Sequence, residues 1–241
     1  MNKFIALISI IIISSSVMAQ DASQVGWVSK FGMAGGFTPM YMMPNLDPVK
    51  DFASAAGIKD FSSSGLITYG GSGYAYIMII DNVRLGGIGF SGSRVVSSGV
   101  DEMKYAIGGG GLTIEYTIPS IRRIAISPGL ILGVGSFDIY ASRNNGDFTW
   151  AGLASDINQG VNTTDNFTRK ITNSYYIISP TLNIDIPFNR FLAFRIGAGY
   201  QLTIADEWSV DNDQKISGMP SDLNGNSFFI QTGLFIGFFA F

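Results

Sequence analysis

The sequence contains neither cysteine nor histidine. Without cysteine, the chain can form no disulfide framework and no thiol nucleophile, and it offers no cysteine for lipid attachment. Without histidine, it lacks the general base on which most hydrolases and acyltransferases depend, and no other residue cluster suggests a catalytic site. We therefore expect no enzyme activity, no cofactor and no metal site.

Charged residues are also scarce. They make up 14% of the 241 residues, whereas 46% are apolar and 30 are glycine. Average soluble chains carry about 25% charged residues, so this chain has too few charges to cover an ordinary soluble surface. The formal net charge of −3 disfavours a nucleic-acid partner, which requires a basic face.

The chain has no apolar run of the roughly 20 residues that a membrane-spanning helix needs. The nearest candidate is the mostly apolar stretch 4–13, which follows Lys3. A small-residue cleavage site follows this stretch and ends at Ala19. That pattern is typical of a secretory signal peptide. We predict a cleaved signal peptide at residues 1–19 and a single β-domain at 20–241.

The strongest order in the sequence is alternation of apolar and polar residues. In the stretch 112–118, every second residue is apolar, and Thr113, Glu115 and Thr117 lie between them. A period of two places apolar and polar side chains on opposite faces of a strand. We predict eight strands, at residues 27–40, 65–80, 83–96, 103–118, 123–140, 171–186, 191–209 and 226–241.

The connections between these strands alternate in length. Short turns follow the second, fourth and sixth strands, and the longer connections are 41–64, 97–102, 141–170 and 210–225. Outer-membrane barrels sort their turns and loops to opposite ends in this way, whereas a secreted sandwich has no reason to do so. The fold class predicted is all-β: an eight-stranded antiparallel up-and-down transmembrane β-barrel, or a ten-stranded one if 141–170 contains a further hairpin.

Four charged residues fall on the polar faces of the predicted strands. These are Glu115, Arg123, Asp185 and Arg195. An eight-stranded barrel has an interior only wide enough for side chains or one small ligand. Unpaired charges there are unfavourable, so we predict that the four side chains pair and plug the lumen.

The chain resembles the small outer-membrane β-barrels, such as the transmembrane domain of outer membrane protein A. The resemblance is carried by the signal peptide, the alternating strands and the last strand, where Phe235, Phe239 and Phe241 share one face. It implies that Phe239 and Phe241 form an assembly signal read by the barrel-assembly machinery. The opposite face of that strand, including Ile230 and Ile236, is also apolar, so we expect part of the lumen to be apolar.

The resemblance also implies a place and a role. It implies export to the outer membrane of a Gram-negative cell envelope, with outer-membrane lipid and lipopolysaccharide as partners. The long loops 41–64, 141–170 and 210–225 are expected to contact lipopolysaccharide or an unidentified partner, extracellular or periplasmic, which makes this a structural or surface-interaction protein. The alternative is a porin-like narrow pore for small solutes or ions.

Overall fold

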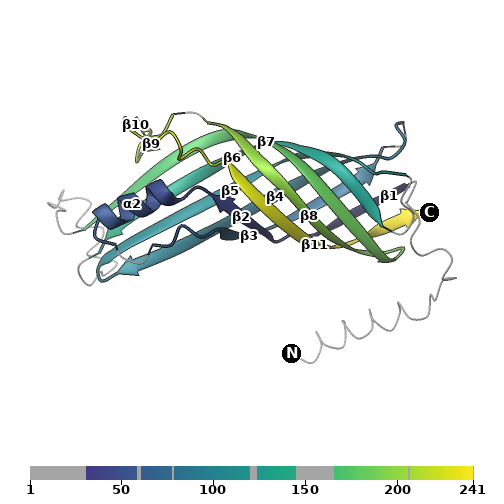
Figure 1. The fold of residues 1–241 in the computed structure, drawn as a ribbon, viewed down its shortest axis with the longest axis horizontal. Helices are drawn as coiled ribbons and strands as arrows, with labels where there is room; N and C mark the ends of the chain where they lie inside the picture. Colours follow the sequence, from purple (N-terminus) through teal and green to yellow (C-terminus); the bar gives the residue numbers. More distant parts are fainter. Residues whose placement is uncertain are drawn as a thin grey trace, which may run out of the picture.

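The structure is a computed structural model, and it describes residues 31–58, 61–77, 79–119, 124–144, 166–205 and 207–240. The predicted signal peptide lies outside these residues. Long antiparallel strands dominate the described chain, with one helix at the end opposite the last residues of β11 (Figure 1). The elements are β1 (Phe31–Phe37), β2 (Met40–Pro44), α2 (Asp47–Ala55), β3 (Leu66–Tyr76), β4 (Val83–Ser98), β5 (Asp101–Tyr116), β6 (Ala125–Arg143), β7 (Phe167–Asn189), β8 (Leu192–Ala205), β9 (Ser209–Val210), β10 (Gln214–Lys215) and β11 (Ser227–Ala240).

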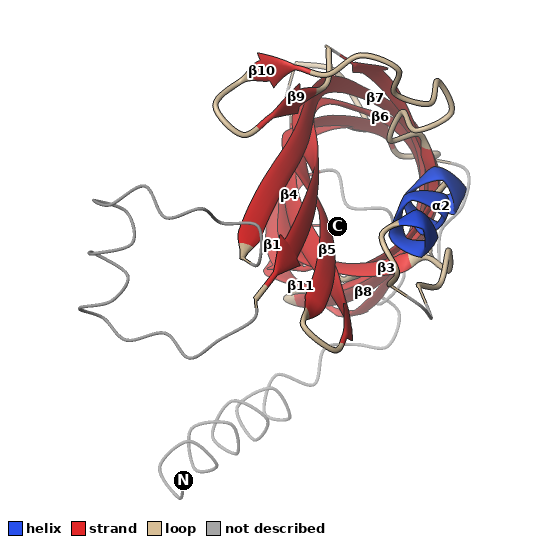
Figure 2. Ribbon diagram, turned by 90° about the vertical axis from the view of Figure 1, so that its left-hand side faces the viewer, coloured by secondary structure: helices blue, strands red, loops and turns tan. Residues whose placement is uncertain are grey.

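The sheet closes on itself. β11 pairs with β8 along one edge and with β1 and β2 along the other, and β1 and β2 in turn pair with β3. β1 and β2 keep one register across Thr38 and Pro39, so they form a single interrupted strand. In the described part of the chain, eight strands therefore complete the ring, which confirms the predicted fold class (Figure 2).

The additional strands β9 and β10 form a small hairpin at the rim and do not widen the ring. β9 pairs with Ile171 and Thr172 of β7, beyond the point where β8 leaves the sheet. This hairpin and α2 lie at the same end of the barrel, opposite the tight turns (Figure 1). A ten-stranded ring would instead need a hairpin within 141–170, of which 145–165 lie outside the described residues.

The two-residue period of the sequence corresponds to side chains that face alternately into the lumen and out of the barrel. In β7, Tyr176 is 67% exposed and its neighbour Ile177 is 2% exposed. The same alternation recurs on the other long strands. No helix among the described residues is both long enough and apolar enough to cross a membrane.

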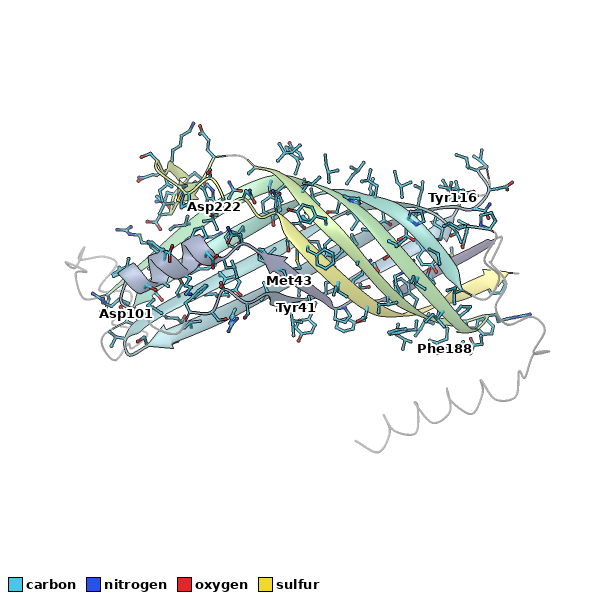
Figure 3. The ribbon with its side chains drawn as sticks, viewed as in Figure 1. Tyr41, Met43, Asp101, Tyr116, Phe188 and Asp222 are labelled. Carbon is cyan, nitrogen blue, oxygen red and sulfur yellow. The ribbon has the colours of Figure 1, made fainter. Side chains whose placement is uncertain are left out.

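The exposed side chains include a band of large apolar residues on every strand of the ring. On β7 this band runs from Tyr176 to Phe188, an axial height of roughly 25–30 Å at the usual strand rise and tilt. The edge of the band nearest the tight turns is called its lower edge. Aromatic residues mark this edge, where Tyr116 and Phe188 lie (Figure 3). Exposed members from each part of the ring are Met33, Tyr41, Ile67, Leu85, Leu112, Val134, Ile178, Leu202 and Ile230.

The half of the lumen nearest the long connections is filled with apolar side chains. Met103, Tyr105 and Phe137 are at most 2% exposed there. α2 packs onto the end of this core through Val49 and Ala53. Pro48 suits the first turn of the helix, and Gly57, with φ of 84°, allows the chain to leave it.

Several expected boundaries need correction. The connection 97–102 is not long, because β4 and β5 extend until only Gly99 and Val100 lie between them. The loop 41–64 begins with β2, and the loop 210–225 contains the end of β9 and all of β10. β6 and β7 likewise extend into 141–170, as far as Arg143 and from Phe167. Hydrogen bonding across the ring sustains these strands well past the alternating segments.

The expected faces of the last strand are reversed. Ile236 is 69% exposed on the outside, whereas Phe235 is 1% exposed and faces the lumen. Both faces of this strand are apolar, so the sequence pattern could not distinguish them. The lumen does contain apolar residues of β11, but they are Phe229 and Phe235.

Candidate functional site: an ion cluster in the lumen

Four charged side chains meet inside the barrel near the tight-turn end. They come from four different strands: Arg84 of β4, Glu115 of β5, Asp185 of β7 and Arg195 of β8, and each is at most 4% exposed. Strand register sets two of the contacts, because Arg84 lies opposite Glu115 and Asp185 lies opposite Arg195. The remaining contacts cross the lumen.

Each arginine bridges both carboxylates. Arg195 donates from Nε to Asp185 Oδ1 at 2.6 Å and from Nη1 to Glu115 Oε1 at 2.9 Å. Arg84 reaches Asp185 Oδ2 from Nη1 at 2.5 Å, and its Nη2 lies 3.0 Å from Glu115 Oε2. The four groups form a closed cycle of alternating charge with no net charge.

Polar side chains form hydrogen bonds with several outer atoms of this cycle, whereas Arg84 Nε has no hydrogen-bond partner among the described residues. Asn183 Nδ2 donates to Glu115 Oε1 at 2.9 Å, and Gln231 Nε2 donates to Asn183 Oδ1 at 2.6 Å. Ser127 accepts a hydrogen bond from Arg84. A buried ion pair is tolerated when such further bonds replace the lost water.

Aromatic rings lie against the guanidinium groups. The Tyr74 ring centroid is 4.3 Å from the Arg84 Cζ and 4.9 Å from the Arg195 Cζ, and Phe235 lies 4.8 Å from the Arg195 Cζ. Planar guanidinium groups stack well on such faces. The ion cycle and these rings therefore pack together at one level of the lumen.

The structure brings three of the four predicted lumenal residues together: Glu115, Asp185 and Arg195. Arg123 lies outside the described residues. Arg84 was not among the predicted lumenal residues, although its position between the apolar residues Val83 and Leu85 places it on the polar face of the strand. The side chains of the predicted assembly residues Phe239 and Phe241 are also outside the description, while the backbone of Phe239 pairs with Gly32 of β1.

Among the described residues, small cavities in the lumen each have a volume of about 10 Å³. One borders the ion cluster and is lined in part by Gln231, whose Oε1 has no hydrogen-bond partner among the described residues. This volume holds about one water molecule. Within the described ranges, no group of acidic side chains is arranged to hold a metal ion.

Comparisons with known proteins agree with this architecture. No family model matches the chain, and no curated protein matches it. Among solved structures, a major outer membrane protein from Thermus thermophilus is similar over 86% of this chain and 99% of that one, with 7% identity and a TM-score of 0.51. The outer membrane protein OprG from Pseudomonas aeruginosa matches 90% of this chain and 99% of its own, with 13% identity and a TM-score of 0.43.

Ail, the attachment invasion locus protein of Yersinia pestis, is a further match, with 8% identity, a TM-score of 0.42, and coverage of 88% of this chain and 99% of Ail. At these identities the similarity concerns the fold. The chain resembles the small outer-membrane β-barrels, as its sequence indicated.

Proposed function

We propose that this chain is an integral outer-membrane β-barrel with a plugged lumen, acting as a structural or surface-interaction protein. The observation that carries the proposal is the band of exposed apolar side chains around a closed ring. A soluble protein rarely exposes an apolar patch larger than a few hundred Å². A bilayer both accommodates such a band and requires a sheet without free edges.

The contents of the lumen favour a plug. The Arg84–Glu115–Asp185–Arg195 cycle blocks one level, and the apolar core above it blocks another. The second possible function, a narrow pore, would require this neutral cycle to open. The small size of the cavities at these two levels, about 10 Å³ each, supports the plug.

The long-loop end supports the interaction role. α2 and the β9–β10 hairpin project there from a rigid scaffold, and half-buried Asp101 and exposed Asp222 lie at the same end (Figure 3). Loops held by rigid scaffolds are common recognition sites. In this proposal the segments 41–64, 141–170 and 210–225 contact lipopolysaccharide or an unidentified partner, and the chain has no enzyme activity.

Export and assembly belong to the same proposal. Residues 1–19 would direct the chain across the inner membrane, and 20–241 would form the barrel. Phe239 and Phe241 would be read by the barrel-assembly machinery. Replacing both by serine should reduce the amount of folded barrel in outer membranes, while Phe238→Ser, which changes an outward residue of the same strand, serves as the control.

Electrophoretic mobility of the purified protein tests the membrane assignment. Barrels that stay folded in detergent migrate differently before and after boiling. We expect such a heat-dependent shift, and extraction from membranes only with detergent. Recovery of the mature chain as a water-soluble monomer would refute the proposal.

Planar bilayer recordings test the plug. The wild-type protein should show little conductance at moderate voltage. Stable open channels in the wild-type protein would instead favour the narrow pore.

A further inference from the structure

A groove of about 820 Å³ lies on the outer wall of the barrel, across β5, β6, β7 and β8. Small outward residues form its floor: Gly108, Gly110, Ser136 and Ser174. Large exposed residues form its lower border: Val134, Tyr176 and Ile204, which are 58%, 67% and 60% exposed. The groove is therefore apolar on one side and small and polar along its floor.

Strand register places this groove at the upper edge of the apolar band. Gly110, Val134, Tyr176 and Ile204 lie opposite one another in a single row across four strands. The next row toward the long-loop end of the barrel contains Gly108, Ser136 and Ser174. In a membrane-embedded barrel, the change from the first row to the second marks the passage from acyl chains to headgroups.

Two lysines stand two rows above the floor. Lys104 of β5, Tyr140 of β6 and Lys170 of β7 lie side by side in register. All three point outward, since their neighbours Tyr105, Ile139 and Ile171 are buried in the lumen. The Lys104 Nζ is 5.5 Å and the Lys170 Nζ 5.7 Å from the Tyr140 ring centroid.

The charges of this row are only partly balanced. Lys170 Nζ lies 3.5 Å from Asp138 Oδ1, which also accepts a hydrogen bond from the Thr172 hydroxyl at 2.8 Å. No carboxylate in the described part of the chain forms an ion pair with Lys104. The row therefore keeps a net positive charge and presents an aromatic face between its two ammonium groups.

We propose that this groove binds the phosphorylated sugar headgroup of an outer-leaflet glycolipid. The lysines would hold phosphate, Tyr140 and the small floor would accept a flat sugar ring, and the lower border would contact acyl chains. The phosphorylated headgroup would belong to a lipid of the membrane, because the groove opens directly onto the apolar band. The proposal rests on the proposed membrane location, but it concerns the strand wall and not the loops.

The packing of the barrel wall does not require the floor of the groove to lack side chains. A Cβ atom at Gly108 would lie 3.6 Å from its nearest neighbour, an ordinary contact distance. A side chain at this position would therefore fill the groove without straining the sheet. Gly108→Leu thus tests the floor separately from the charges.

Native mass spectrometry of the full mature protein in detergent, titrated with diphosphorylated lipid A, tests the proposal. Each near-surface lysine contributes roughly fivefold to affinity for an anionic lipid, so the double variant K104Q/K170Q should bind roughly 25-fold more weakly. Lys50→Gln changes an exposed lysine on α2 and should leave binding unchanged. Wild-type preference should fall in the order diphosphorylated lipid A, monophosphorylated lipid A, phosphatidylglycerol.

Gly108→Leu should also weaken lipid A binding several-fold, whereas Gly35→Leu, on the outer face of β1 with similar space, should not. Lipid A binding unchanged in K104Q/K170Q would overturn the proposal, and so would equal binding of phosphatidylglycerol. Every variant is first checked for the heat-dependent mobility shift. Loss of that shift in the wild-type protein would instead refute the membrane assignment itself.

Discussion

At the residue scale, Arg195 joins both carboxylates of the lumenal cycle. Its guanidinium contacts both Glu115 and Asp185 and lies against the Tyr74 and Phe235 rings. Removing one member of a buried ion network leaves uncompensated charge and costs about 3–5 kcal/mol. We expect Arg195→Gln to lower the free energy of unfolding by roughly that amount, measured by denaturant titration in lipid vesicles.

The same variant tests the plug. If the ion cycle blocks flow, Arg195→Gln should raise ion conductance in planar bilayers. Arg169→Gln, which changes an exposed arginine paired with Asp211 at the rim, is the control and should leave conductance unchanged. Equal conductance of wild-type and Arg195→Gln proteins would contradict a plug at this level.

Asp211, just after β9, provides a prediction about pH. The backbone N–H of Lys170 and then the Arg169 guanidinium lower the pKa of the Asp211 carboxyl below its ordinary value, which is about 3.9 in an unfolded chain. A lowered pKa stabilises the folded hairpin at pH values above the ordinary one. This stabilisation is lost as the pH falls from about 4 through the folded pKa.

Trp208 reports on that hairpin because its ring packs edge-on against Phe137, with centroids 5.8 Å apart. With Trp27 and Trp150 replaced by phenylalanine, its fluorescence should change as the pH falls below about 4. Asp211→Asn should abolish most of that change, while Asp213→Asn should retain it. The same transition in the Asp211→Asn protein would show that another group controls the hairpin.

At the element scale, β5 and β6 approach each other too closely for side chains at one pair of positions. Gly111 and Gly133 lie opposite one another, and a Cβ atom on Gly133 would fall 2.2 Å from the backbone oxygen of Gly110. Gly89, on the outer face of β4, has open space where its Cβ would be. Glycine is thus required at the first site and dispensable at the second.

We expect Gly133→Ala to reduce the yield and stability of folded barrel, because the sheet must shift to accept the methyl group. Gly89→Ala should be neutral or slightly stabilising, since it lowers the entropy of the unfolded chain. Refolding yield, scored by the heat-dependent mobility shift, measures both. A normal yield for Gly133→Ala would mean that the two strands can separate without loss.

At the scale of the whole molecule, the apolar band predicts how stability depends on depth. Leu182 is 50% exposed in the middle of the band, and Thr168 of the same strand is exposed well above it. Arginine facing lipid costs about 2–4 kcal/mol at the bilayer midplane and about 0–1 near the interface. Leu182→Arg should therefore destabilise the barrel in vesicles far more than Thr168→Arg does, as measured by denaturant unfolding. Equal effects would indicate that the band faces water.

Much of the architecture was predictable because a two-residue period has one structural meaning. Alternation at 112–118 predicted a strand whose two faces differ, and β5 covers most of that stretch; β8 likewise lies within the predicted strand 191–209. The ion cluster was predicted only in part. Glu115, Asp185 and Arg195 lie on polar faces, but their meeting with Arg84 depends on register and on contacts across the lumen.

The sequence by itself determined that the chain forms long amphipathic strands, because side-chain alternation is a local property of each strand. Where both faces of a strand are apolar, only the tertiary structure decided which face lines the lumen. Phe235 points inward and Ile236 outward, since closure of β11 against β1 and β8 fixes the orientation of the whole strand. Closure also created the ion cycle and the outer groove, because each joins residues of several strands that only pairing brings to the same height.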